Sequence, residues 1–97
     1  MANNLVSIIV PIHNAEKFIE DTILSVKSQT DKNWELILVD DASTDKSREL
    51  IQSYCDEQIR LITSDKSRGA ANTRNTGLQN AQGRFITFLD ADDLWVP

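Results

Sequence analysis

Leu36-Ile37-Leu38-Val39-Asp40-Asp41-Ala42-Ser43-Thr44-Asp45 joins an apolar run directly to a cluster of acidic and hydroxyl side chains. An apolar run of this kind is typical of a β-strand buried on both faces, and it predicts a strand over Trp34–Val39. Ser43 is a suitable N-cap, so we expect a helix to begin there. The inner stripe of that helix would consist of Leu50, Ile51, Tyr54 and Cys55. This stretch therefore predicts a strand that leads straight into a helix.

The same alternation of strand and helix patterns continues on both sides of this stretch. Leu5–Val10 is a strand pattern that Pro11 ends, and Ala15–Gln29 has helical spacing. The apolar positions of that helix are Phe18, Ile19, Ile23 and Val26. The later predicted elements are a strand at Arg60–Thr63, a helix that ends near Gly83, and a strand at Phe85–Leu89. Because alternating strands and helices favour right-handed parallel crossovers, we predict an α/β fold with a Rossmann-like open, mostly parallel sheet of about four strands and flanking helices.

Composition restricts the class of protein and its partners. The 97 residues, with 40% hydrophobic and 26% charged side chains, are typical of one small globular domain. A net charge of -5 argues against nucleic acid and anionic membranes as partners. The single cysteine excludes an internal disulfide, and no apolar segment approaches the ~20 residues of a membrane span. We therefore expect no transmembrane segment and a cytoplasmic location.

Two of the predicted strands end in acidic residues. Asp40-Asp41 follows the second strand, and Asp90-Ala91-Asp92-Asp93 follows the fourth. Ligands of open α/β sheets bind outside the carboxyl ends of the strands. If the two strands are neighbours, five carboxylates share one rim, and like charges ~4 Å apart repel by roughly 4 kcal/mol at an effective dielectric near 20. A divalent cation is the expected filler, whereas a cap for the following helix is the simpler alternative for each cluster.

The third helix and the first strand-to-helix turn add further candidates. The inner face of the helix would contain Ala71, Leu78 and Ala81, with Arg74 and Asn75 on the same face. A buried arginine needs an anion, which is either one of the aspartates or a diphosphate. The turn at residues 11–14 contains no glycine, which excludes a dinucleotide fingerprint or a P-loop there. Phosphates would therefore be held by a metal.

Four ordered motifs resemble the family-2 glycosyltransferases. They are Val6–Glu16, Val39–Asp45, Gly69 with Arg74–Gly77, and Leu89–Asp93, and together they extend over nearly the whole chain. The resemblance implies the N-terminal half of a GT-A fold, a nucleotide-diphosphate-sugar donor that is usually UDP-linked, Mn²⁺ or Mg²⁺, and inversion at the anomeric carbon. It also implies that residues 1–97 form the nucleotide-sugar-binding subdomain. The acceptor-binding half and the general base would then lie beyond these residues. The catalytic residues are therefore not identified.

The same resemblance assigns roles to individual residues. Pro11 and Asp41 would contact the base, Arg74 would lie near the nucleotide, and Asp90 with Asp92 would form the D-x-D motif that meets ribose and metal. The expected nucleotide-binding residues are Pro11, His13, Asn14, Glu16, Asp40, Asp41, Ser67, Arg74, Asp90 and Ala91, and the expected metal ligands are Asp90 and Asp92. Two positions depart from the family pattern: His13 stands where Tyr is common, and Ser67 where Asn is frequent.

Two other functions fit the same pattern of elements. A haloacid-dehalogenase-type phosphatase also carries Asp-x-Asp after an apolar strand, but in that family the motif opens the fold. A non-catalytic nucleotide-binding or protein-interaction module would share the α/β shape. For the transferase, we expect a role in glycan or cell-envelope polysaccharide synthesis, with the full-length protein peripheral at the cytoplasmic membrane face. We also expect an apolar edge at Leu89, Leu94, Trp95 and Val96 that favours self-association.

Overall fold

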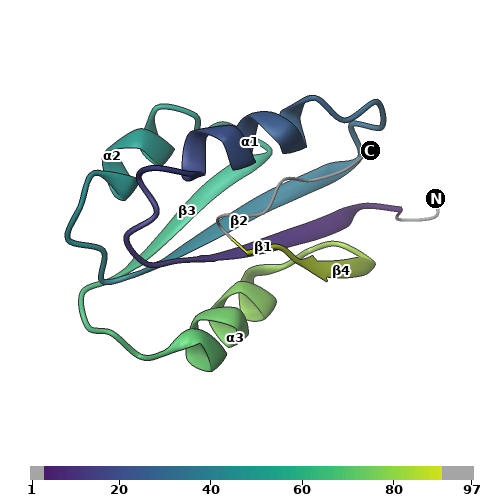
Figure 1. Ribbon diagram of the computed structural model, residues 1–97. Coiled ribbons are helices and arrows are strands. Elements are labelled where there is room, and N and C mark those ends of the chain that lie inside the picture. The colour runs from purple at the N-terminus through teal and green to yellow at the C-terminus, as the bar shows by residue number, and fades with distance from the viewer. Residues whose placement is uncertain (1–3, 91–97) are drawn as a thin grey trace.

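The computed structural model describes residues 4–90, which form one four-stranded parallel sheet with helices on both faces (Figure 1). The elements are β1 (Val6–Ile12), α1 (Ile19–Lys27), β2 (Trp34–Asp41), α2 (Ser47–Gln52), β3 (Ile59–Ser64), α3 (Ala70–Asn80) and β4 (Phe85–Phe88). The strand order is β3-β2-β1-β4, and every pairing is parallel. Helices α1 and α2 cover one face, and α3 covers the other (Figure 1). The predicted α/β class and four-stranded parallel sheet are confirmed.

Strand β2 is buried along its whole length because it has a strand on each side and helices on both faces. Its side chains alternate between the faces, as in any β-strand. Leu36 and Leu38 pack into the core beneath α1 and α2, and Asp40 pairs with Arg48 of α2. By this alternation, the side chains of residues 35, 37, 39 and 41 face α3. The two adjacent acids at the end of the strand therefore point to opposite faces of the sheet.

The two faces of the sheet are packed differently. Beneath α1 and α2 lies a core of large aliphatic side chains, including Ile8, Ile23 and Leu38, which are fully buried. On the other face, α3 lies close to β1 because Gly77 has no side chain: a Cβ at that position would collide with Ile9. The buried side of α3 consists of Thr73 and Gly77 rather than large apolar residues. This helix is therefore held by close approach and by polar contacts.

Strand β1 extends further than its sequence pattern predicted, because Pro11 does not end it. The strand continues through Pro11, which pairs with Val39, to Ile12. The carbonyl of Ile9 accepts the Leu89 N–H, so the polar groups of Ile9, and of Pro11 two residues later, face the edge next to β4. Pairing with β4 has ended at Phe88, so no strand requires the N–H that proline lacks.

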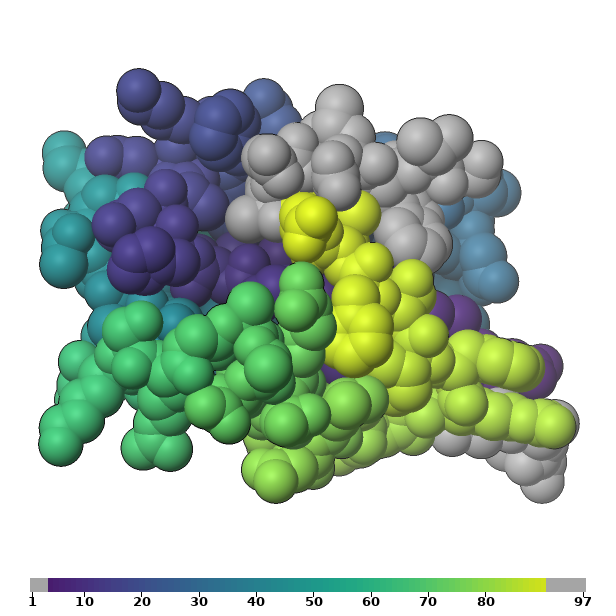
Figure 2. Space-filling view, turned by 60° about the horizontal axis from the view of Figure 1, so that its bottom comes forward, coloured from purple at the N-terminus to yellow at the C-terminus, as the bar shows by residue number. Residues whose placement is uncertain are grey.

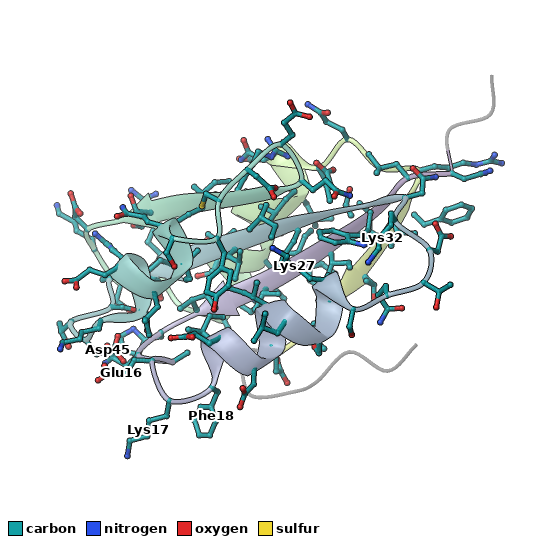
Figure 3. The ribbon with its side chains drawn as sticks, turned by 90° about the horizontal axis from the view of Figure 1, so that it is seen from above. Glu16, Lys17, Phe18, Lys27, Lys32 and Asp45 are labelled. Atoms are coloured by element: carbon teal, nitrogen blue, oxygen red, sulfur yellow. The ribbon has the colours of Figure 1, made fainter. Side chains whose placement is uncertain are left out.

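The helices are shorter than their apolar patterns predicted. Helix α1 begins at Ile19, and Phe18 is half exposed and points away from the sheet (Figure 3). Helix α2 begins at Ser47 rather than at Ser43, because the Asp45 carboxylate accepts the Ser47 N–H at 2.9 Å. Cys55 lies beyond the end of α2 and is exposed, so its predicted place in the inner stripe is wrong.

The last two elements also differ from their predicted burial. On α3, Ala71, Leu78 and Asn75 are exposed, so the predicted inner face is wrong. Strand β4 lies at the edge of the sheet beside α3, where Figure 2 shows it at the surface. Its large apolar side chains are about half exposed: Phe85, Ile86 and Phe88. An apolar run identifies a strand but does not show whether both of its faces are covered.

Candidate functional site

A cavity of about 200 Å³ opens at the carboxyl end of the sheet, between β1 and α3. Its lining comes from the ends of β1 and β2, the first turns of α3 and the residue beyond β4: Pro11, Ile12, His13, Asp41, Ala70, Thr73, Arg74 and Asp90. The chain order reverses between β1 and β4, which is where open α/β sheets bind ligands. We call this cavity the crevice. Five of the predicted site residues line it.

Asp41 is held at the crevice by the loop that precedes α3. Its carboxylate accepts hydrogen bonds from the Arg68 amide at 2.8 Å, the Gly69 amide at 3.2 Å and the Ser67 hydroxyl at 3.2 Å. The Arg68 amide is the largest cause of a lowered pKa for Asp41; burial opposes it, and the other two donors add to it. Within residues 4–90, no lysine or arginine side chain forms an ion pair with Asp41. Asp41 is therefore an ionised acceptor that no lysine or arginine of the described residues neutralises.

His13 is exposed, lines the crevice and is fixed by the end of β2. Its Nδ1 lies 2.7 Å from the backbone carbonyl oxygen of Asp41. Because a carbonyl only accepts, Nδ1 carries the proton in this bond, and Nε2 is left for other partners. The ring can therefore present its face or Nε2 to a ligand in the crevice.

Arg74 and Asp90 face each other across the rim of the crevice. Arg74 Nη2 lies 4.0 Å from Asp90 Oδ1, and the two side chains are 42% and 65% exposed. The prediction of a buried Arg74 is therefore wrong, although the guanidinium does lie at the crevice. An exposed pair at this distance contributes little stability, so both groups are available to a ligand.

The predicted metal ligands are only partly within the described residues. Asp90 presents an exposed carboxylate at the rim, whereas Asp92 and Ala91 lie outside the described residues. Within residues 4–90, no three His, Cys, Asp or Glu side chains gather around one point. A hard carboxylate oxygen at Asp90 suits Mn²⁺ or Mg²⁺, but it is one ligand of the several that such ions require.

Asp40 lies on the other face of the sheet and away from the crevice. Its carboxylate is fully buried and accepts hydrogen bonds from Arg48 Nε at 2.6 Å and from the Ser43 amide at 3.1 Å. Strand β1 also separates β2 from β4, so the two strands that end in acids are not neighbours. The expectation that these two strands are neighbours is therefore wrong, and Asp40 does not reach the rim, although Asp41 and Asp90 both line the crevice. A nucleotide-binding role for Asp40 stays a prediction.

Asn14 and Glu16 join the loops that follow β1 and β2. Asn14 Oδ1 accepts the amides of Thr44 at 2.8 Å and Asp45 at 3.3 Å, and the Glu16 amide donates to Asp45 Oδ2 at 3.2 Å. Figure 3 shows Glu16 and Asp45 next to each other at this end of the sheet. Burial alone would raise the pKa of Asp45, but hydrogen bonds from Ser47 and from the Glu16 amide outweigh it and lower the pKa. The two residues support the crevice, and their contact with a nucleotide stays a prediction.

A third buried carboxylate, which was not predicted from the sequence, lies at the opposite end of β2. Glu35 accepts hydrogen bonds from the Ser7 hydroxyl at 2.5 Å, the Gln82 amide at 2.6 Å and Arg60 Nη2 at 2.8 Å. Arg60 also donates to the Asn80 carbonyl at 2.8 Å. This network ties the end of α3 to the sheet. A charged residue inside an otherwise apolar strand was the available signal, since such a residue must have partners.

Comparisons with known proteins agree with this geometry. The sequence model of the family described as glycosyl transferase family 2 matches residues 7–97. The Escherichia coli UDP-Glc:alpha-D-GlcNAc-diphosphoundecaprenol beta-1,3-glucosyltransferase WfgD is 49% identical over 96 residues, which is 99% of this chain and 38% of that protein. The putative teichuronic acid biosynthesis glycosyltransferase TuaG of Bacillus subtilis is 48% identical over 93 residues, 94% of this chain and 37% of its own length.

Solved structures show the same fold. S. aureus TarS 1-349 in complex with UDP-GlcNAc superposes with a TM-score of 0.86 at 31% identity, over 92% of this chain and 27% of that one. The mannosyltransferase PcManGT from Pyrobaculum calidifontis, in complex with GDP-Man and Mn²⁺, gives 0.82 at 32% identity, over 93% of this chain and 28% of its own. The chain thus spans less than two fifths of the length of these relatives. The family match also leaves the phosphatase alternative without support.

Proposed function

The chain belongs to glycosyl transferase family 2, and on this premise we propose that it is the donor-binding part of an inverting enzyme that uses a UDP-sugar. The sugar would pass to a saccharide or other acceptor in cell-envelope polysaccharide synthesis, as the names of WfgD and TuaG suggest. The observation that carries this proposal is the crevice, where Asp41, His13, Arg74 and Asp90 meet at the switch point of the sheet. Residues 1–97 would supply the nucleotide site and not the acceptor site.

Base recognition follows from the ionised state of Asp41. A carboxylate that cannot donate requires an N–H partner, and the N3–H of uracil is such a donor. Cytosine presents a lone pair at N3 instead, so the carboxylate would repel it. His13 also lines the crevice, where its ring can pack against the base. TarS is known in complexes with UDP and UDP-GlcNAc, which agrees with uracil as the base.

The diphosphate needs positive charge that the crevice supplies only in part. Arg74 is one nearby cation, and the turn after β1 has no glycine with which to cradle phosphates. We propose that Asp90 and Asp92 hold Mn²⁺ or Mg²⁺ at the rim, with the exposed Asp90 carboxylate as one ligand. When bound, such an ion neutralises the charge that develops on the leaving diphosphate. Ionised Asp41 and Asp90 would otherwise repel the nucleotide.

No described carboxylate at the crevice remains for the general base. Asp41 is assigned to the nucleobase of the donor, and Asp90 to its ribose and to the metal. Inverting transfer requires a base within hydrogen-bond reach of the acceptor hydroxyl. We therefore expect the 97-residue chain to bind the donor without transferring its sugar. Enzyme-like release of UDP from a UDP-sugar with Mn²⁺ and simple acceptors, lost in Asp92→Ala, would contradict this assignment.

Calorimetric titration with UDP tests the nucleotide site directly. Binding is expected with Mn²⁺ or Mg²⁺ and is expected to disappear with EDTA, and Asp92→Ala should behave like EDTA treatment. Equal affinity with and without EDTA would refute the metal, while leaving the nucleotide site intact. Absence of UDP binding under all conditions would favour the alternative of a non-catalytic interaction module.

Location and self-association are further parts of the proposal. No helix within residues 4–90 is long and apolar enough to span a bilayer. We propose a cytoplasmic enzyme that is peripheral at the membrane in its full-length form, supported by the lipid-linked acceptor in the name of WfgD. The apolar edge expected from the sequence falls mostly on Leu94, Trp95 and Val96, which lie outside the described residues. We propose that this chain self-associates through β4, whose Phe85, Ile86 and Phe88 are about half exposed. Light scattering of the wild type and of Phe88→Asp tests this, and a monomeric wild type would refute it.

A further inference from the structure

Arg48 occupies an unusual position behind the crevice. It lies in the first turn of α2, where a positive side chain is disfavoured by the helix dipole. Its Nε donates to the buried Asp40 at 2.6 Å, and its Nη2 donates to the Ser64 carbonyl at 2.7 Å. The guanidinium therefore spans the carboxyl ends of two strands, β2 and β3. A cation in this place is explained by its contacts and not by helix preference.

The Ser64 carbonyl links Arg48 to the loop that holds Asp41. This oxygen also accepts the Ala42 amide at 2.9 Å, so it fixes the residue that directly follows Asp41. Ser64 is paired with Asp41 in the sheet and begins the loop whose Ser67–Gly69 segment donates to the Asp41 carboxylate. Movement of Ser64 would therefore shift the donors of Asp41 and the backbone beside it together.

We propose that Arg48 is a positioning residue for Asp41 and so determines how the crevice reads the nucleobase. It does not line the crevice, and it acts through Asp40 on one side and through Ser64 on the other. The effect on the nucleobase rests on the proposed function, whereas the effect on the Asp41 loop does not. The competing explanation is that Arg48 only neutralises the buried charge of Asp40.

Arg48→Lys separates these two roles. A lysine keeps the positive charge for Asp40, but its single nitrogen cannot reproduce the two separate arms of the guanidinium. Arg60→Lys is the control for the substitution itself: Arg60 also joins a β2 carboxylate, Glu35, to a backbone carbonyl, that of Asn80, at the far end of the strand, but it does so through Nη2 alone. The same substitution is thus made in two similar networks, of which one lies behind the crevice.

The experiment measures UDP and CDP affinity with Mn²⁺ and the hydrogen exchange of the Arg68 and Gly69 amides. Arg48→Lys is expected to weaken UDP binding about three- to tenfold, an effect the size of one ordinary hydrogen bond, and to reduce the preference for UDP over CDP. It should also accelerate exchange of both amides, because their acceptor is less well fixed. Arg60→Lys should change none of these quantities by more than about twofold, since its network is remote from the crevice.

The outcomes are distinct. Unchanged amide exchange in Arg48→Lys would overturn the proposal, as would an equal loss of UDP affinity in both lysine variants. A wild type that fails to bind UDP would refute the proposed function, and the amide exchange would still decide whether Arg48 positions the loop. If Arg48→Lys folds poorly, a double variant that combines Asp40→Asn and Arg48→Leu removes both charges together. That double variant should show the same faster exchange, and normal exchange in it would equally overturn the proposal.

Discussion

The two ends of β2 each hold a buried carboxylate on the same face of the sheet, but their partners differ. Glu35 is bonded to a guanidinium, a hydroxyl and an amide, so its charge is neutralised inside the protein. Asp41 is bonded to two amides and a hydroxyl, and it borders a cavity of about 200 Å³. The first arrangement stabilises the fold. The second keeps a negative charge available to a ligand.

The difference arises from what each end of the strand meets. At the Glu35 end, the chain passes from α3 into β4, where the Gln82 amide donates to the carboxylate and the Asn80 carbonyl accepts from its partner Arg60. At the Asp41 end, the parallel strands stop and the loops diverge, so that, among residues 4–90, the donors to the carboxylate come from the loop before α3. The same residue class on one strand can therefore be structural or functional, depending on whether a cation completes its set of partners.

The largest effect is expected from Glu35→Ala. The substitution removes the buried carboxylate to which the Ser7 hydroxyl, the Gln82 amide and Arg60 all donate. We expect the free energy of unfolding to fall by about 3 kcal/mol in urea titrations followed by circular dichroism. UDP affinity of the molecules that remain folded should stay within about twofold of the wild type. A loss of UDP affinity in the folded fraction would break the division between the two ends.

Asp41→Asn tests the other end of the strand. The amide keeps one acceptor oxygen for the loop but loses the charge, so nucleotide binding should suffer more than stability. We expect UDP affinity to fall by about 1.5–3 kcal/mol and the free energy of unfolding by about 1 kcal/mol. Glu57→Gln, at an exposed position between α2 and β3, controls for the change in net charge. Unchanged UDP affinity with intact circular dichroism would mean that Asp41 only anchors its loop.

Low pH should reduce the stability that Glu35 and Asp41 contribute at the two ends of β2, because each carboxyl has a lowered pKa in the folded protein. Burial alone would raise the pKa of Glu35, but its bonds to Ser7 and Gln82 and the charge of Arg60 bring it below 4.5, and the pKa of Asp41 lies below 3.8. A carboxyl whose pKa is lower in the folded than in the unfolded protein stabilises the folded state at any pH above the unfolded-state pKa. This stabilisation is lost as the pH falls through the folded-state pKa. The free energy of unfolding should therefore decline between about pH 5 and pH 3.

Glu35→Gln separates the two contributions to this decline. It removes one titrating group, so the fall in unfolding free energy with decreasing pH should be shallower than in the wild type. UDP affinity should also fall on acidification, because protonated Asp41 no longer presents a carboxylate to the nucleobase. This fall should be the same in Glu35→Gln as in the wild type. Identical pH curves for wild type and Glu35→Gln would show that the Glu35 network does not contribute to acid stability.

The class of the fold and the position of the site could be predicted from the sequence because both follow from periodicity. Apolar runs that end in short polar residues give parallel strands with their carboxyl ends together, and this brought Pro11, His13, Asp41, Arg74 and Asp90 to one crevice. Strand order and edge position depend on contacts between distant segments. For that reason, the exposure of β4 and its separation from β2 were not predicted.

The adjacent acids of β2 show a distinction that the sequence could have predicted. Asp40 and Asp41 look equivalent in sequence, yet alternation along a strand sends them to opposite faces. Asp40 then meets Arg48, a non-local partner that no spacing rule identifies. Asn14 and Glu16 are similar cases, since their partners in residues 44–45 come from another loop. Site residues that act through tertiary hydrogen bonds are the part that sequence patterns leave open.

The smallest effect is expected from Ala42→Gly, directly after Asp41. Ala42 has a φ of 56°, in the left-handed region that a Cβ disfavours by roughly 1–2 kcal/mol. Glycine relieves this strain but increases the freedom of the unfolded chain, so a net gain of about 0.5 kcal/mol is expected in urea unfolding. Asn14 has a similar φ of 52°, yet Asn14→Gly should be destabilising because its side chain accepts the Thr44 and Asp45 amides. If Ala42→Gly raises stability and also lowers UDP affinity, the strained backbone itself helps to present Asp41, and the contrast with the Glu35 end extends from side-chain partners to the main chain.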